Sequence, residues 1–268
     1  MFDLAALEAE LAGTLFAGKL HFSRVTGATN SDAVAAARLG APHGSVYFSD
    51  EQLAGRGRGD HGWISAAGEG LYVSVLLRPQ IPAARLAFLP FAAGLAAADA
   101  IRTVSALEID LRWPNDLLIG PRKTGGILVE SGNDSKGLPH AVVPYAVVGI
   151  GINVHQRTFP PDLATPATSL DLETNRHIAR PALLLALLKS LQQEALALAN
   201  SDAAKKIATR VEKASTWIRG RRVEVHGPQA CSGVTAGLDE NGFLRVATAA
   251  GLVTVQTGGL RAESASSR

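Results

Sequence analysis

Hydrophobic and polar positions follow two different patterns along the chain, and the change from one to the other falls near Trp217. Upstream, apolar runs of strand length are interspersed with longer Ala- and Leu-rich stretches that favour helices. Strands are predicted at 21–25, 45–49, 71–77, 108–112, 117–119, 126–131 and 141–150, and helices at 1–18, 29–39, 83–104, 183–200 and 203–214. This mixture of helices and strands predicts an α+β fold.

Downstream of Trp217 the apolar runs are short and are separated by turn residues. Strands are predicted at 222–225, 230–238, 243–248 and 253–257, and Asn241-Gly242 is a strong hairpin signal. Closely spaced short strands are typical of a small β-barrel. The sequence therefore predicts two domains, residues 1–216 and residues 217–268, without internal repeats.

The composition is that of a folded protein with a large core. The 268 residues are 47% hydrophobic and 19% charged, and the net charge of +2 is too small to indicate a nucleic-acid-binding surface. Cys231 is the only cysteine, so no internal disulfide is expected, and the thiol is interpreted as structural in a cytoplasmic, reducing compartment. The first residues include Asp3, Glu8 and Glu10 rather than a basic segment, which argues against a signal peptide. No apolar run reaches eighteen residues without a charge, so no membrane span is predicted.

Residues 52–63 read Gln-Leu-Ala-Gly-Arg-Gly-Arg-Gly-Asp-His-Gly-Trp and carry the strongest chemical signal in the chain. The four glycines prevent a helix or strand from persisting, and they expose backbone N–H groups. Arg56 and Arg58 add guanidinium groups, which bind carboxylate or phosphate oxygens in pairs. The segment therefore predicts a loop that closes over an anionic small molecule, although a flexible solvated loop is the alternative.

A dinucleotide-binding interpretation of the same loop is weak. Gly57-x-Gly59-x-x-Gly62 matches the Rossmann pattern formally, but that pattern requires a preceding strand and a following helix. Here a predicted strand at 71–77 follows, and no acidic residue ends a second strand at the expected distance. A P-loop is excluded because the sequence has no Gly-Lys-Ser/Thr.

Four further segments carry candidate chemistry. They are Thr29-Asn30, Trp113-Pro114-Asn115-Asp116, Lys123-Thr124-Gly125-Gly126 and Gly149-Ile150-Gly151-Ile152-Asn153. Each has an ordinary alternative: a helix cap, a surface turn, a hairpin lysine and a local turn amide, respectively. A lysine that enters an apolar strand beside two glycines is the least ordinary of the four, because its ammonium needs an anion.

Taken together, the loop and these segments resemble the biotin protein ligase family, whose members adenylate biotin and attach it to a lysine of a carrier protein. The motifs are Thr-Asn before a helix, Gln-x-x-Gly-Arg-Gly-Arg, Trp-Pro-Asn-Asp, Lys-x-x-Gly-Ile-Leu-Val-Glu and Gly-Ile-Gly-Ile-Asn, and the resemblance runs from about residue 21 to residue 260. It implies a catalytic domain similar to the class II aminoacyl-tRNA synthetases, with a mixed or antiparallel sheet and helices, followed by a small SH3-like β-barrel.

The resemblance also implies roles for individual residues. Biotin contacts fall on Ala28, Thr29, Asn30, Gln52 and the loop Gly55-Arg56-Gly57-Arg58. Lys123, beside Gly125 and Gly126, bridges the biotin carboxylate and the α-phosphate of ATP, and it is expected to be catalytic together with Arg56 and Arg58. Trp63 stacks on the adenine, and Asn115, Asp116 and Asn153 lie near the nucleotide, with Asp116 as the candidate Mg²⁺ ligand. Residues 155–169 are expected to form a second loop that orders over the adenylate.

Three positions depart from the family pattern. Ala28 stands where members commonly have serine, Asp60-His61-Gly62 replaces a further arginine, and Gly258-Gly259-Leu260 replaces the frequent Gly-Glu-Val of the barrel. These differences remove a hydroxyl near biotin, a cation near ATP and a glutamate that faces the carrier.

The function implied is ATP-dependent biotinylation of the biotin carboxyl carrier protein of acetyl-CoA carboxylase or another biotin-dependent carboxylase, with biotin, ATP and Mg²⁺ bound. A lipoate ligase shares this chemistry and is the main alternative, although Trp-Pro-Asn-Asp and the Gly-Arg loop favour biotin. About twenty residues precede His21, too few for the helix-turn-helix unit of the family's repressors, so no DNA binding is expected. The sequence does not distinguish a monomer from a homodimer.

Overall fold

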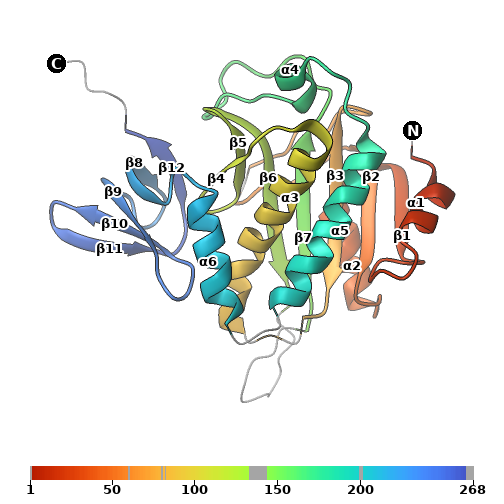
Figure 1. Ribbon diagram of the computed structural model, residues 1–268, viewed down its shortest axis with the longest axis horizontal. Helices are drawn as coiled ribbons and strands as arrows, with labels where there is room; N and C mark the ends of the chain where they lie inside the picture. The colour runs from red at the N-terminus through yellow and green to blue at the C-terminus, as the bar shows by residue number, and fades with distance from the viewer. Residues whose placement is uncertain are drawn as a thin grey trace.

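The apolar segments of the first two thirds of the chain pair into one mixed sheet (Figure 1). The computed structural model describes residues 2–59, 61–79, 81, 83–132, 144–198 and 202–263. Within these ranges the sheet has seven strands in the order β1-β2-β3-β7-β6-β5-β4. Their bounds are β1 Leu20–Thr26, β2 Ser45–Gln52, β3 Gly70–Leu77, β4 Asp110–Arg112, β5 Asp116–Ile119, β6 Arg122–Ser131 and β7 Ala146–Asn153. β1 and β2 are parallel, and every other neighbouring pair is antiparallel.

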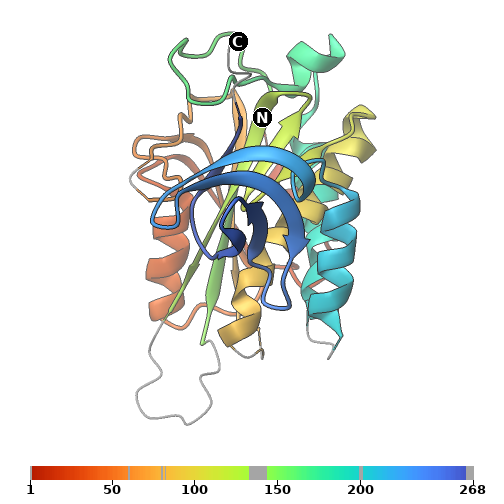
Figure 2. The ribbon, with the colours of Figure 1, turned by 90° about the vertical axis from the view of Figure 1, so that its left-hand side faces the viewer.

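Helices cover both faces of this sheet. α2 (Thr29–Arg38) lies on one face, whereas α3 (Leu89–Ser105) and α5 (Arg180–Leu198) lie together on the other, as Figure 2 shows. β3 is buried along its whole length, so its successive side chains serve opposite cores. Val73 and Val75 belong to the large core with α3 and α5, whereas Leu76 packs with Ala33 and Ala37 of α2.

The long predicted helix at 83–104 is divided. Residues Ala83–Phe88 form a 3₁₀ helix, and α3 begins at Leu89, with Pro90 in its first turn. Proline lacks the N–H that an α-helix interior needs but is tolerated in the first turn, so a new α-helix begins at Leu89, directly before Pro90. In the described ranges, Arg85–Ser105 is the one helix long and apolar enough to cross a membrane, and 61% of its apolar window is buried inside the protein. A core helix passes the same test.

The remaining helices are shorter or begin elsewhere than predicted. α1 covers only Leu4–Glu10, because turns follow from Leu11 onward. α5 ends at Leu198, α6 spans Ala203–Lys213, and the short α4 (Leu170–Thr174) was not predicted. Met1, residues 141–143 of the predicted strand at 141–150, and residues 199–200 of the helix predicted at 183–200 lie outside the described residues.

A second sheet follows α6. Among the described residues it has five strands in the order β11-β10-β9-β8-β12, all antiparallel. The strands are β8 Arg219–His226, β9 Cys231–Leu238, β10 Leu244–Thr248, β11 Gly251–Val255 and β12 Gly259–Ala262. Asn241-Gly242 lies in the turn between β9 and β10, with a positive φ of 81° at Gly242, while β12 was missed. The cores are continuous, since Trp217 and Ile218 belong to the same buried cluster as α3.

Candidate functional site

A pocket of about 800 Å³ opens between the large sheet and the second sheet. Its walls include the Gly-Arg loop, the start of α2, β6, β7, the segment 156–167 and the turns of the second sheet at 226–227 and 257–261. The predicted site residues that line it are Ala28, Thr29, Asn30, Gln52, Arg56, Gly57, Arg58, Trp63, Asn115, Asp116, Lys123, Gly126 and Asn153. The structure thus gathers segments separated by more than a hundred residues around one space.

Trp63 lies on a floor made by the backbone of β6 and β7. A Cβ atom on Gly151 would stand 2.6 Å from the indole Nε1, so only glycine permits this approach. Gly126 is close to the same ring, and the Lys123 ammonium lies 5.5 Å from the ring centroid in a cation–π arrangement. The two glycine motifs therefore position the indole beside the lysine.

Asp116 holds two cations at the pocket wall. Its Oδ1 is 2.6 Å from the Lys123 ammonium, and its Oδ2 is 2.6 Å from Nη2 of Arg112. Burial of Asp116 raises its pKa, but the nearby charges of Lys123 and Arg112 outweigh this, so that its pKa is lowered overall. The carboxylate therefore stays ionised and orients the lysine toward the pocket.

The same contacts bear on the predicted Mg²⁺ site. Both oxygens of Asp116 are engaged by Lys123 and Arg112, and no other carboxylate of the described residues lines the pocket. Mg²⁺ needs free oxygen ligands, which it takes from carboxylates, substrate phosphates and water. Asp116 as it stands does not fit the role of a Mg²⁺ ligand.

Arg56 is paired with a residue that the sequence analysis did not single out as part of the site. Glu130 of β6 forms an ion pair with Arg56 at 3.0 Å and accepts a hydrogen bond from Nδ2 of Asn30 at 2.9 Å. Glu130 thus joins the Gly-Arg loop to the start of α2. The available signal was its place at the end of the Lys-x-x-Gly-Ile-Leu-Val-Glu motif.

Arg58 reaches across the pocket to the second sheet. Its guanidinium donates to the carbonyl oxygen of Gly258 at 3.0 Å and to Oγ1 of Thr257 at 3.3 Å, with Oδ1 of Asn115 at 3.5 Å. Burial lowers the pKa of Arg58, and the charge of Asp116 acts in the opposite direction. Arg58 therefore contacts Gly258, directly beside Gly259, where the family pattern has a glutamate. His61 folds back onto the carbonyl of Arg58, and Asp60 lies outside the described residues.

Thr29 and Asn30 do not cap α2, which corrects the cap interpretation. The N-cap residue is Ala28, and it makes no side-chain cap hydrogen bond. Thr29 donates from its backbone N–H to Oε1 of Gln52 at 2.9 Å, and its hydroxyl lies 2.8 Å from that of Ser74. Asn30 fills the space that a side chain at Gly149 would occupy. A polar network at the pocket therefore replaces the cap.

The predicted second loop lies along β6. Lys123 donates its backbone N–H to Pro166 and accepts from Thr168, at 2.8 and 2.9 Å. The side chain of Asn153 donates to the carbonyl of Thr168 at 3.0 Å, and Arg112 donates to Oγ1 of Thr165 at 2.9 Å. Asn153 and Arg112 thus hold the pocket wall, and Arg112 was not among the predicted site residues.

Gly55 and Gly125 do not line the pocket. Gly55 accepts the N–H of Trp63 at 2.8 Å, and a Cβ on Gly125 would stand 2.8 Å from the carbonyl of Gly151. Both glycines serve close backbone packing. Cys231 opens β9, half-buried, and burial raises the pKa of its thiol, in line with its structural interpretation.

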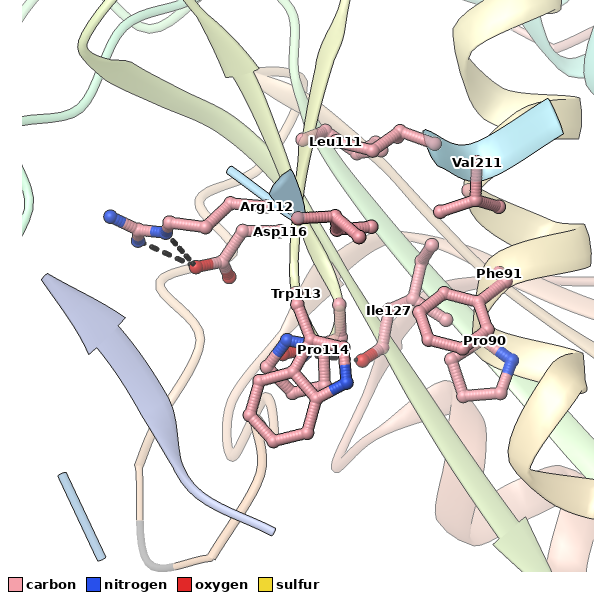
Figure 3. Close-up of a pocket in the computed structure, with 13 residues that line it drawn as sticks. Pro90, Phe91, Leu111, Arg112, Trp113, Pro114, Asp116, Ile127 and Val211 are labelled. Atoms are coloured by element: carbon pink, nitrogen blue, oxygen red, sulfur yellow. Dashed lines mark hydrogen bonds and ion pairs between the residues drawn. The ribbon is translucent and has the colours of Figure 1, made fainter. Parts of the chain in front are cut away.

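The Trp-Pro-Asn-Asp turn separates two environments, as Figure 3 shows. Leu111 points toward the apolar side chains of Phe91 and Val211, around a space of only about 10 Å³. Arg112 and Asp116 point to the opposite side, where they pair. Successive side chains of a strand alternate in this way, so the turn delivers its charges to the large pocket.

Comparison with known proteins agrees with this arrangement. Residues 27–153 match the model of the biotin/lipoate A/B protein ligase family. The biotin–[acetyl-CoA-carboxylase] ligase of Mycobacterium tuberculosis is 33% identical over 245 residues, which cover 87% of this chain and 85% of that protein. The chain belongs to the biotin protein ligase family.

Other members of the family differ more in length or sequence. The bifunctional ligase/repressor BirA of Bacillus subtilis is 35% identical over 167 residues, so the match spans about half the length of that relative. The solved biotin protein ligase from Aquifex aeolicus in complex with biotin and ATP is 27% identical, with a TM-score of 0.76 over 91% of this chain and 98% of that chain.

Proposed function

We propose that this protein is an ATP-dependent ligase that attaches biotin to a carrier-protein lysine through biotinyl-5′-AMP. The charge of the pocket carries the proposal, because five basic side chains line it against one described carboxylate, that of Asp116. The basic residues are Arg56, Arg58, Arg112, Lys123 and Arg261. Two anions that must react with each other need such a surplus of positive charge.

In the first step, a biotin carboxylate oxygen attacks the α-phosphorus of ATP, the bond to the β-phosphate oxygen breaks, and pyrophosphate leaves. Lys123 binds both reacting anions, and the contacts of its ammonium with Asp116 and the Trp63 ring support this role. Arg56 and Arg58 stabilise the charge that develops on the phosphate oxygens. This step needs no covalent nucleophile on the protein. Among the described residues that line the pocket, no carboxylate fits the Mg²⁺ expected with ATP, so no step is assigned to it.

In the second step, the ε-amine of the carrier lysine attacks the acyl carbon, the bond from that carbon to the phosphate oxygen breaks, and AMP leaves. The proton that the amine loses passes to the solvent. The mixed anhydride reacts with water, so the enclosing loops have a chemical purpose. Both the Gly-Arg loop and residues 156–167 border the pocket. They are placed to shield the adenylate until the carrier arrives.

We further propose that residues 1–216 form the catalytic domain, of the class II synthetase type, and that residues 217–268 form an SH3-like barrel that contributes the 257–261 wall. The partner is the biotin carboxyl carrier protein of acetyl-CoA carboxylase, which is consistent with the substrate in the name of the Mycobacterium relative. A cytoplasmic location and the lack of DNA or membrane binding remain predictions, which anisotropy with duplex DNA and vesicle sedimentation test.

Pyrophosphate release from Mg-ATP tests the proposal, with biotin and lipoate as parallel substrates and Lys123→Ala as the matched inactive control. Pyrophosphate release with biotin but not with lipoate supports the proposed biotin ligase activity. Release with lipoate alone retains adenylation and overturns the substrate, which matters because the matched family model covers both ligases. Release with neither substrate overturns the activity.

A further inference from the structure

Outside the pocket, two histidines and an aspartate converge on one point at the base of the second loop. Nδ1 of His155 lies 2.8 Å from Oδ2 of Asp171, and Nδ1 of His177 lies 3.2 Å from the same oxygen. The two imidazole rings are stacked, with centroids 4.2 Å apart and planes 13° from parallel. We propose that these three side chains form a binding site for a divalent transition-metal ion such as Zn²⁺.

The distances between the potential ligand atoms suit a metal centre. All three atoms lie within 4.8 Å of one another. Atoms bound to one tetrahedral Zn²⁺ lie about 3.3 Å apart when each bond is 2.0–2.1 Å. The two nitrogen–oxygen distances, 2.8 and 3.2 Å, fall near this value. The two rings are nearly parallel, so at least one imidazole has to rotate for both Nδ1 lone pairs to point at the ion. The exposed His177 ring has room for this rotation.

The surroundings support the carboxylate in the way a metal ligand requires. The second oxygen of Asp171, Oδ1, accepts the backbone N–H of Ile178 at 2.9 Å, which fixes the carboxylate plane. Asp171 is 4% exposed, whereas the side chain of His177 is 79% exposed. The site is therefore rigid on its inner side and open to solvent on its outer side, where an ion can enter and keep a water ligand.

The donor set distinguishes this site from one for Mg²⁺. Two imidazole nitrogens and one carboxylate oxygen suit zinc and its neighbours, whereas Mg²⁺ prefers oxygen ligands. Each imidazole binds as the neutral ring through Nδ1 and carries its proton on Nε2. The site therefore stays selective at the magnesium concentrations that accompany ATP.

A metal ion at this site would connect the two ends of the second loop. His155 begins the second loop, and Asp171 and His177 follow its end at Ser169, so one ion joins both ends of the loop. The backbone already brings them together, because Asp171 donates its N–H to the carbonyl of Val154 at 2.9 Å. Metal binding should therefore limit movement of the segment that borders the pocket.

Isothermal titration of the chelator-treated full chain with Zn²⁺, in millimolar Mg²⁺, tests the site. We expect one saturable equivalent, and at least about a tenfold weaker affinity in His177→Ala, since changes even to outer-shell partners cost that much. His177 is exposed, so this variant keeps its fold. Asp171→Asn retains the acceptor for Ile178 and should weaken binding similarly.

His21→Ala is the matched control, because His21 is also exposed and stacks on Tyr47, away from the cluster. It should bind Zn²⁺ as the wild type does, and Zn²⁺ should raise the melting temperature of the wild type and of His21→Ala but not of His177→Ala. An absence of saturable binding overturns the site. Equal losses in His177→Ala and His21→Ala also overturn it, because they indicate non-specific histidine binding.

Discussion

The two loops that enclose the pocket are fastened in different ways. The Gly-Arg loop makes backbone hydrogen bonds at its start, from Ala54 to Gly27, and its arginines are held by charged and polar partners, through the pair of Arg56 with Glu130 and the contacts of Arg58 with the second sheet. The second loop is held by backbone hydrogen bonds of Lys123 to Pro166 and Thr168, together with the side-chain hydrogen bonds of Asn153 and Arg112 described above. An anionic ligand competes for guanidinium groups but not for a paired backbone. The first loop is therefore the one whose position responds to a bound carboxylate or phosphate.

Lys123 contacts both loops, through its backbone to Pro166 and Thr168 and through its ammonium to Trp63. Its removal should therefore lower the rate of adenylation the most. In Lys123→Ala the backbone contacts to the second loop remain, while the ammonium that faces both anions is lost. We expect biotin-dependent pyrophosphate release to fall by about 10²–10³-fold, the usual cost of one preorganised transition-state contact. Lys189→Ala, which removes an exposed lysine paired with Glu10, should leave the rate unchanged. Normal adenylation by Lys123→Ala would refute the assigned role.

Asp116 pairs with Arg112 and Lys123 at the pocket wall, so its effect should appear in stability. Its lowered pKa means that its contribution is complete above the unfolded-state pKa of about 3.9 and is lost as the pH falls through the lower folded-state value. Asp116→Asn leaves Lys123 and Arg112 without their counter-charge, at a cost of about 3 kcal/mol near neutral pH. Urea unfolding at a series of pH values should show this difference shrinking below about pH 4. A difference that is independent of pH contradicts the prediction.

Arg58 and Arg157 allow the two loops to be compared directly. Arg58→Ala removes charge-assisted contacts worth about 2 kcal/mol, so bound biotinyl-5′-AMP should escape about 10–100-fold faster. Arg157 is exposed in the second loop and does not line the pocket, so Arg157→Ala serves as the control. Stopped-flow dilution of the loaded enzyme measures both rates. If the wild type and Arg58→Ala release biotinyl-5′-AMP at the same rate, Arg58 does not hold the Gly-Arg loop closed.

The smallest change in stability is expected when the hydrogen bond between Arg112 and Thr165 of the second loop is removed. Thr165→Ala removes the hydrogen bond from Arg112 and should cost about 1 kcal/mol. Because the backbone bonds of Lys123 remain, hydrogen exchange of amides 163–168 should accelerate by less than about tenfold. Complete loss of protection there would show that side chains, rather than the backbone, fasten this loop.

Much of the fold and site was predictable because it depends on local patterns. Alternation predicted most strands, including β3, and the turn-rich pattern placed the second sheet downstream of Trp217. Every proposed site residue except Gly55 and Gly125 lines the pocket. The predicted cap at Thr29-Asn30 was wrong, because their side chains pair instead with Gln52 and Glu130, which come from distant strands.

The sequence by itself determined which residues carry positive charge and where glycines permit close approach, since composition and spacing are properties of the chain. Only the tertiary structure decided which groups pair with these charges. Arg56 with Glu130, Arg58 with Gly258 and His155 with Asp171 join elements that are far apart in the chain, whereas Asp116 and Arg112 pair locally across the β4–β5 hairpin. The reason is physical: an ion pair is set by distances of a few ångströms in space, and sequence spacing does not specify such distances between separate elements.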